Sequence, residues 1–284
     1  MDAPTFENEL TLARARRAGE EERVHEAYES AVADVRERLG EAHPLRIGGE
    51  SLERDERFVT HSPGDLDLRI GEFAAGDAHA VDRAVDAASE TFDDWRALSG
   101  AERAAVFRDA ADCLRDRKFT LAATVSLENG KGRVEALADV DEAVDFLAFY
   151  ARELARHDGF VRDTGEPTPG ERCRNVRRPY GVIAVVAPFN FPLAILAGMT
   201  TGAAIVGNTT VVKPASATPL IAHEFLDVLE SAGLPDGVVN LVTGGGRAVG
   251  SPLVEHEDVS GVAFTGSRAV GGEIRREDAE RPGP

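Results

Sequence analysis

The chain has 284 residues, with 50 acidic and 32 basic side chains and a formal net charge of −18. This length allows one large domain with a sizeable core, and the negative charge disfavours nucleic acid and anionic membrane surfaces as partners. The charged N-terminus lacks the apolar core of a signal peptide, and the apolar stretch 191–206 is shorter than the ~20 residues that cross a membrane.

The use of cysteine and lysine bears on where the protein works. Cys113 and Cys173 fit neither a disulfide scaffold nor a zinc site, which suits a reducing cytoplasm. Only three of the 32 basic residues are lysines, namely Lys118, Lys131 and Lys213. Many carboxylates with few lysines favour a halophilic protein that works in multimolar salt, where charges are strongly screened. An acidic cytosolic protein from a GC-rich genome would have the same composition, so both origins stay open.

The first 172 residues are predicted to form helices and a hairpin. Apolar residues at helical spacing indicate one long charged helix over 8–39, and Gly48-Gly49 is typical of a hairpin turn within 43–65. Four further segments have helical periodicity and few breakers: Ala78–Leu98, Ala101–Arg117, Phe119–Glu128 and Arg133–His157. The segment 158–172 is rich in Gly, Pro and acids, and we expect a linker there.

From residue 173 the pattern becomes that of a parallel α/β fold. A candidate strand at 173–178 precedes four apolar, β-branched runs: Val182–Val186, Thr210–Val212, Val238–Val242 and Val259–Phe264. Helical segments lie between these runs: Leu193–Val206, Pro219–Ala232 and Arg247–Val254. Thr218 is the expected N-cap of the middle helix, with Pro219 at its first position. Apolar strands alternating with helices predict an α/β fold, a Rossmann-like parallel sheet with helices on both faces and the N-terminal helices and hairpin packed on it.

Four short motifs follow the four predicted strands: Pro188–Pro192 (PFNFP), Lys213–Ser216 (KPAS), Gly244–Gly246 (GGG) and Thr265–Ser267 (TGS). Each motif alone is most often a simple turn. The carboxyl ends of parallel strands meet at one edge of a sheet, where helix N-termini carry positive partial charge. All four motifs at this edge together predict a nucleotide site.

The order of these motifs within Pro179–Gly272 resembles the cofactor-binding half of the aldehyde dehydrogenase superfamily. The resemblance extends upstream to Leu127–Lys131 (LENGK) and Asp141–Tyr150 (DEAVDFLAFY), so that it covers the whole chain. Within the superfamily, PFNFPLAILAGMT, GNTTVVKPASATP and FTGSRAVG are most similar to 1-pyrroline-5-carboxylate dehydrogenases. These enzymes oxidise glutamate γ-semialdehyde to glutamate in proline catabolism.

The resemblance implies an oxidoreductase that converts an aldehyde to a carboxylic acid. In the superfamily a cysteine thiolate attacks the aldehyde, hydride passes to NAD(P)⁺, and a glutamate activates water to release the acid. The asparagine of the PFNFP-type motif, here Asn190, donates its amide N–H to the oxyanion, a contact worth ~3 kcal/mol in the transition state. Asn190 could instead only cap the helix that begins near Leu193.

The same resemblance implies contacts to a nicotinamide dinucleotide, NAD or NADP. Lys213 would donate to the adenosine ribose hydroxyls, unless it is a solvated surface lysine. Ser216 stands where many NAD-preferring relatives carry glutamate, so it would admit NADP, unless it is only a loop residue. The Gly246–Gly250 helix would approach the adenine, and Gly266, Ser267 and Gly271 would form the pyrophosphate turn. The expected contacts also include Ala187, Pro188, Phe189, Gly246, Gly250, Phe264, Thr265 and Val270.

In the superfamily the catalytic cysteine and glutamate follow the matched segment, in a second domain, and members form homo-oligomers. We therefore expect an N-terminal half, with a helical and hairpin part (1–172), a cofactor-binding part (173–284) and no catalytic domain. Neither Cys113 nor Cys173 matches a catalytic motif, and the seven scattered histidines predict no metal site. Two functions stay open. The chain could serve aldehyde oxidation together with a separate catalytic half, or it could be an inactive NAD(P)-binding fragment or truncated gene product.

Overall fold

A computed structural model describes residues 6–280 of the chain. Its helices are α1 (Thr11–Ala18), α2 (Glu21–Glu37), α3 (Ala78–Ala97), α4 (Gly100–Asp116), α5 (Lys118–Asn129), α6 (Arg133–Arg156), α7 (Ala194–Ala204), α8 (Pro219–Ser231), α9 (Ser251–Glu255) and α10 (Arg268–Glu280), with short turns η1 (Asp158–Phe160) and η2 (Gly246–Gly250). Its strands are β1 (Ala42–His43), β2 (Leu45–Ile47), β3 (Glu50–Leu52), β4 (Arg57–Ser62), β5 (Asp65–Ala74), β6 (Val161–Gly165), β7 (Cys173–Val176), β8 (Val182–Val186), β9 (Thr209–Lys213), β10 (Val239–Leu241) and β11 (Val259–Phe264).

The central sheet confirms the predicted α/β fold class. Its strand order is β11-β8-β9-β10-β2-β3, and the strands from β11 to β10 are parallel. Chain order therefore reverses between β8 and β11, and loops that leave these two strands diverge to opposite faces of the sheet. In doubly wound sheets, ligands bind in the crevice at such a reversal, outside the carboxyl ends of the strands. The predicted hairpin around Gly48-Gly49 extends this sheet as the antiparallel strands β2 and β3.

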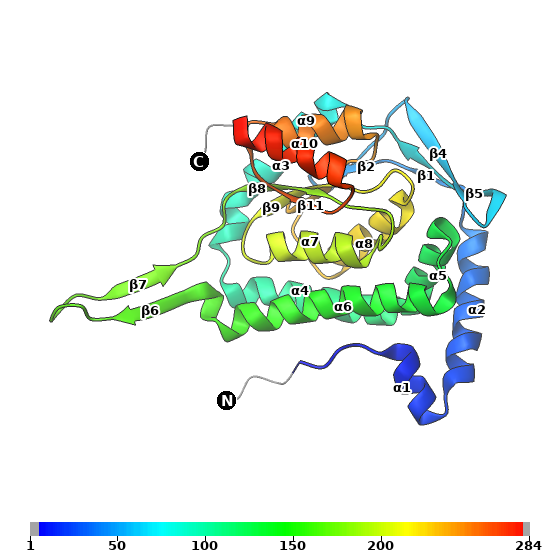
Figure 1. Cartoon of the computed structure of the whole chain (residues 1–284), viewed down its shortest axis with the longest axis horizontal. Coiled ribbons are helices and arrows are strands. Elements are labelled where there is room, and N and C mark those ends of the chain that lie inside the picture. The colour runs from blue at the N-terminus through cyan, green and yellow to red at the C-terminus, as the bar shows by residue number, and fades with distance from the viewer. Residues whose placement is uncertain (1–5, 281–284) are drawn as a thin grey trace.

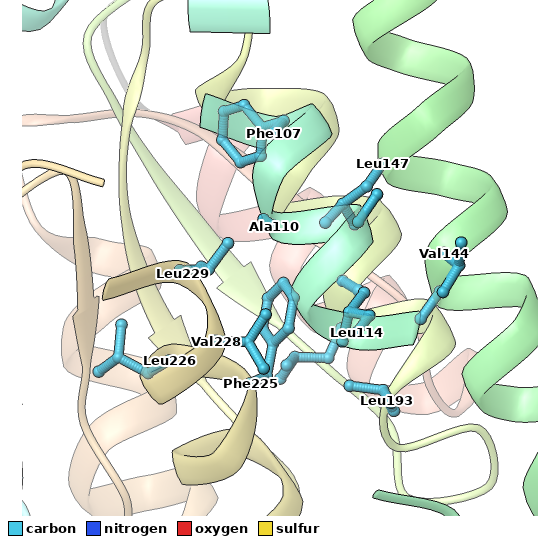
Figure 2. Close-up of a cluster of buried hydrophobic side chains, with 14 of the residues drawn as sticks. Phe107, Ala110, Leu114, Val144, Leu147, Leu193, Phe225, Leu226, Val228 and Leu229 are labelled. Carbon is cyan, nitrogen blue, oxygen red and sulfur yellow. The ribbon is translucent and has the colours of Figure 1, made fainter. Parts of the chain in front are cut away.

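Helices cover both faces of the sheet (Figure 1). Helices α7 and α8 pack on one face, with α4 and α6 behind them, and α3 and α9 pack on the other. Side chains from α4, α6 and α8 converge in the largest core cluster (Figure 2), with Phe107, Leu114, Leu147 and Phe225 almost fully buried. A second cluster lies between α3 and the opposite face of the sheet. Both clusters join N-terminal helices to the sheet, so packing on its two faces fixes the position of the strand ends.

Several boundaries differ from the prediction. The single helix expected over 8–39 is wrong, because Gly19 ends α1 in the left-handed conformation with φ 73° and α2 starts at Glu21. The expected linker 158–172 contains strand β6, which pairs with β7 in an exposed hairpin that projects from the body (Figure 1). Strands β4 and β5 form a further hairpin, which joins β1 in a separate three-stranded sheet. In the described part of the chain, no helix is both long and apolar enough to cross a bilayer.

The C-terminal end of α7 is held by Trp95 of α3 and Arg103 of α4. The Trp95 indole N–H donates to the Ala204 carbonyl at 2.8 Å, and Arg103 Nε donates to the Ile205 carbonyl at 2.9 Å. The Arg103 guanidinium also donates to the carbonyls of Leu98 and Arg96, and the residue is 7% exposed. A cation at a helix C-terminus interacts favourably with the helix dipole. Arg103 thus fixes the end of α7 opposite the predicted site.

Candidate functional site

The register of the sheet brings the four predicted motifs to one edge. Phe264 of β11 lies opposite Val186 of β8, and Val186 lies opposite Lys213 of β9. The Ala187 N–H donates to the Lys213 carbonyl at 3.1 Å, and the Thr265 N–H donates to the Val186 carbonyl at 3.3 Å. The loops that begin after these strands are therefore neighbours, as the sequence predicts.

Lys213 is buried and carries no salt bridge within residues 6–280. It is 6% exposed, and its Nζ donates to the carbonyl of Pro214 at 2.7 Å. Burial lowers the pKa of the Lys213 ammonium to about 8. This rules out the alternative of a solvated surface lysine. A buried ammonium with a single carbonyl partner retains donors for further acceptors.

The loops after β9 and β10 meet beside Lys213. The Ser216 hydroxyl donates to the Gly244 carbonyl at 2.9 Å, so this serine ties the two loops together. A Cβ atom at Gly250 would lie 3.6 Å from Lys213 Cδ, which places η2 alongside the lysine stem. A Cβ atom at Gly245 or Gly246 would meet open space, so the bare backbone there is open to a ligand.

The turn after β11 folds back over the ring of Phe264. A Cβ atom at Gly266 would come within 2.7 Å of that ring, and one at Gly271 within 3.1 Å. The glycines are thus needed for this close approach. The Ser267 hydroxyl accepts the Val270 N–H at 3.3 Å in the first turn of α10. Among the other predicted contacts, Thr265, Gly266, Ser267, Phe189 and Val270 are exposed, and Pro188 is partly buried.

Asn190 is exposed in the loop between β8 and α7. Its side chain has no hydrogen-bond partner in the part of the chain that the structure describes. The cap of α7 comes from another helix, since the Asp139 carboxylate of α6 accepts the Ala194 N–H at 2.7 Å. The interpretation of Asn190 as only a helix cap is therefore wrong, and its amide is left for a ligand.

Helix α8 is also capped from a distance. Thr218 is the N-cap residue and Pro219 opens the helix, as predicted, but the Thr218 side chain makes no capping hydrogen bond. The Glu128 carboxyl group of α5 instead accepts the N–H groups of Leu220 at 2.6 Å and Ile221 at 3.0 Å. Burial raises the pKa of Glu128 to about 8, against the lowering effect of these two N–H donors. Two of the helix N-termini at this edge are thus occupied by protein carboxyl groups. An anionic ligand would have to use η2 or α10.

Replacing Glu128 with alanine is expected to destabilise the fold. The substitution leaves two buried N–H groups of α8 without a partner, which costs ~2 kcal/mol of unfolding free energy. Urea unfolding at neutral pH measures this loss. Glu135→Ala, an exposed acid in the first turn of α6, is the matched control and should change stability by less than ~0.5 kcal/mol. Equal stability of the two variants would show that Glu128 does not hold α8.

The turn Glu128–Lys131, which ends α5 and leads into α6, contacts the loop between β8 and α7 and the start of α8. Asn129 Nδ2 donates to the Phe189 carbonyl at 2.8 Å, and Lys131 Nζ lies 3.4 Å from the centroid of the Phe191 ring. Lys131 also pairs with the buried Asp139 at 2.8 Å. The sequence marked this turn only through its resemblance to other proteins. Glu128 is the single acidic residue of helix α5, and this was the signal in the sequence that could have identified the turn.

Neither cysteine lies at the site. Cys113 is half-buried in α4 and packs against the main core. Cys173 is exposed and pairs with Gly165 in the projecting hairpin. That hairpin follows the C-terminal end of α6, whereas Lys131, which contacts the site, lies just before the N-terminal end of α6. The helix has 24 residues, so the two ends are separated by ~36 Å.

The residues at this edge fit a nicotinamide dinucleotide. The Lys213 ammonium suits ribose hydroxyls or phosphate, and the open backbone at Gly245 and Gly246 leaves room for a planar base. The Ser267 hydroxyl lies at the first turn of α10, where an anion is favoured, and the Thr265 hydroxyl donates to Met199 Sδ of α7 at 3.6 Å. In the described part of the chain, no cluster of three or more His, Cys, Asp or Glu side chains could hold a metal ion.

Comparison with known proteins agrees with this geometry. The sequence model of the aldehyde dehydrogenase family matches residues 51–283. The chain is 44% identical to 1-pyrroline-5-carboxylate dehydrogenase 2 of Bacillus subtilis (strain 168), over 88% of this chain and 48% of that protein. It is 43% identical to 1-pyrroline-5-carboxylate dehydrogenase of Bacillus pumilus (strain SAFR-032), over 89% of this chain and 49% of that protein. The chain thus spans about half the length of the curated relatives it matches.

Solved structures give the same picture. A 1-pyrroline-5-carboxylate dehydrogenase from Thermus with bound NAD matches 98% of this chain and 52% of that chain, with a TM-score of 0.88 and 36% identity. Proline utilization A (PutA) from Bdellovibrio bacteriovorus, inactivated by N-propargylglycine, matches 96% of this chain and 28% of that chain, with a TM-score of 0.90 and 35% identity.

Proposed function

Because this chain belongs to the aldehyde dehydrogenase family, we propose that it supplies the dinucleotide site and the oxyanion donor for oxidation of an aldehyde to a carboxylic acid. The proposed substrate is glutamate γ-semialdehyde, oxidised to glutamate, in line with the names of the curated relatives. The observation that carries the proposal is the buried Lys213 ammonium at a strand end, without a carboxylate partner among the described residues.

The residues have separate roles in this proposal. Lys213 binds the adenosine ribose, and the turn that contains Gly266 and Ser267 receives the pyrophosphate at the start of α10. The dinucleotide that these residues would hold would supply the hydride acceptor for the oxidation. The Asn190 amide donates to the oxygen of the aldehyde as it becomes negative. Ser216 carries no charge to repel a 2′-phosphate, so both dinucleotides are proposed ligands.

The covalent step needs a thiolate next to Asn190, and neither Cys113 nor Cys173 lies there. We therefore propose that the 284-residue polypeptide binds the dinucleotide but needs a catalytic half with a cysteine and a glutamate for turnover. The alternative is a chain that only binds NAD(P). Assays of purified chain with and without a co-expressed catalytic half of a relative separate the two. Restored NAD(P)H production supports the enzyme, and binding without restoration supports the alternative.

Replacing Lys213 with alanine should weaken dinucleotide binding. The loss of one or two hydrogen bonds from the ammonium costs ~1–2 kcal/mol, which lowers affinity ~5- to 30-fold. Titration calorimetry with NAD⁺ and NADP⁺ measures the change. Arg162→Ala, which removes a positive charge from the exposed hairpin, is the control and should bind like the wild type. Unchanged affinity in Lys213→Ala would remove this residue from the site.

Dinucleotide affinity should also depend on pH through Lys213. The pKa of the free chain's Lys213 is about 8, so the ammonium loses its charge as pH rises through this value, and affinity for the anionic ligand should fall. The stability of the free chain should change in the opposite sense. Between pH ~8 and ~10.5 the unfolded chain binds the additional proton, so folding is favoured as pH rises. Both trends should be absent in Lys213→Ala, and trends that persist would assign them to another group.

A further inference from the structure

The residues on each side of Asn190 are both held by the turn between α5 and α6. Asn129 Nδ2 donates to the carbonyl of Phe189 at 2.8 Å, and Lys131 Nζ lies 3.4 Å from the ring centroid of Phe191. We propose that Asn129 and Lys131 are positioning residues that orient Asn190 for its contact with the substrate oxyanion. This inference rests on the function proposed above.

The loop needs such support because Asn190 and the residues next to it are exposed, although Ala187, Pro192 and Leu193 at its two ends are buried. Phe189 is 59% exposed and Phe191 is 37% exposed, so core packing does not fix the backbone around Asn190. The loop is tied at its start by the Ala187 N–H to the Lys213 carbonyl, and at its end by the Ala194 N–H to Asp139. The contacts from Asn129 and Lys131 act between these two ties.

The supporting turn is itself firmly anchored. Glu128 is 3% exposed and caps α8, and Lys131 pairs at 2.8 Å with Asp139, which is fully buried and caps α7. Gly130 takes φ +81° to end α5, and a Cβ atom there would come within 2.9 Å of Pro63. The turn therefore connects the N-termini of α7 and α8, the two helices that follow Asn190 and Lys213 in the chain.

The arrangement meets the physical requirement for an oxyanion donor. Such a donor stabilises a transition state best when it needs no reorganisation as the charge develops. The Asn190 side chain has no partner within residues 6–280, while the residues next to it are fixed. Asn129 holds the backbone at Phe189 and Lys131 holds the ring of Phe191, which leaves the Asn190 amide free to donate.

Backbone NMR relaxation in the 284-residue chain tests the positioning directly, without turnover. Asn129→Ala should lower the order parameters of the N–H groups of Phe189, Asn190 and Phe191 from ~0.85 to below ~0.6, since the hydrogen bond to the Phe189 carbonyl is lost, without a change in β8 or β9. Asn175→Ala, in the exposed hairpin, is the control and should leave these order parameters unchanged. Unchanged order parameters at 189–191 in Asn129→Ala would overturn the proposal.

A double-mutant cycle in the chain paired with a catalytic half tests whether Asn129 acts through Asn190. Asn129→Ala should lower kcat ~5- to 10-fold with little change in the KM for NAD⁺, and by less than ~2-fold when Asn190 is already alanine. Lys131→Arg should retain more activity than Lys131→Met. The same loss in both backgrounds would assign Asn129 a role independent of Asn190. If the wild-type pair shows no turnover, the proposed function fails, and the relaxation result still decides this inference.

Discussion

Asn190→Ala is expected to lower the rate of aldehyde oxidation by ~10²–10³-fold when the chain is paired with a catalytic half. The physical reason is the loss of a fixed donor at the atom where negative charge develops. The structure leaves the Asn190 amide exposed and without a partner in the described residues, and assigns the cap of α7 to Asp139. Steady-state production of NADH from glutamate γ-semialdehyde measures the effect.

Two comparisons make the Asn190 result specific. The variant should bind NAD⁺ with unchanged affinity, because the amide contacts the substrate oxygen in the proposed arrangement. Asn175→Ala removes an equivalent amide from the projecting hairpin and should retain full activity. A loss of less than ~3-fold in Asn190→Ala would be too small for an oxyanion donor and would contradict this role.

Arg103→Ala is expected to destabilise the fold by ~3 kcal/mol, because it removes the donor to one buried and two partly buried carbonyls and removes the cation from the end of α7. These carbonyls belong to Ile205, Leu98 and Arg96. Burial lowers the pKa of the Arg103 guanidinium. Its contacts are hydrogen bonds to three backbone carbonyls, and alanine has no donor to replace them. Urea unfolding measures the loss.

The control for Arg103 lies on the same helix. Arg108 is exposed in α4, and its replacement by alanine should change stability by less than ~0.5 kcal/mol. Arg103→Lys should recover part of the loss, since an ammonium can reach some of the same carbonyls but lacks the planar fork. An Arg103→Ala variant as stable as Arg108→Ala would show that the end of α7 does not depend on this side chain.

The parallel strands could be predicted closely from the sequence because each is an apolar run bounded by turns. Val182–Val186 and Val259–Phe264 were predicted at the observed residues. Strand β6 was missed for the converse reason, since all of its residues are exposed and no burial pattern distinguishes it. The break between α1 and α2 was missed because Gly19 interrupts the helix without disturbing the apolar spacing on each side.

The positions of the candidate site residues were predictable where chain order alone places them, as with Lys213 and the loops at the strand ends. The support of that site was not. Glu128 and Asp139 look like ordinary helix acids, and only the packing of α5 and α6 shows that they are buried and cap α8 and α7. Such caps join segments 55 to 93 residues apart in the chain, which local patterns do not record.

A crystal structure of the 284-residue chain grown with NAD⁺ tests the central claim most directly. The account predicts the dinucleotide at the carboxyl ends of β8, β9 and β11, with the adenosine ribose within hydrogen-bonding distance of Lys213 Nζ. It also predicts the pyrophosphate at the start of α10, beside Ser267. A dinucleotide bound elsewhere on the chain, with Lys213 still bonded only to the Pro214 carbonyl, would contradict it.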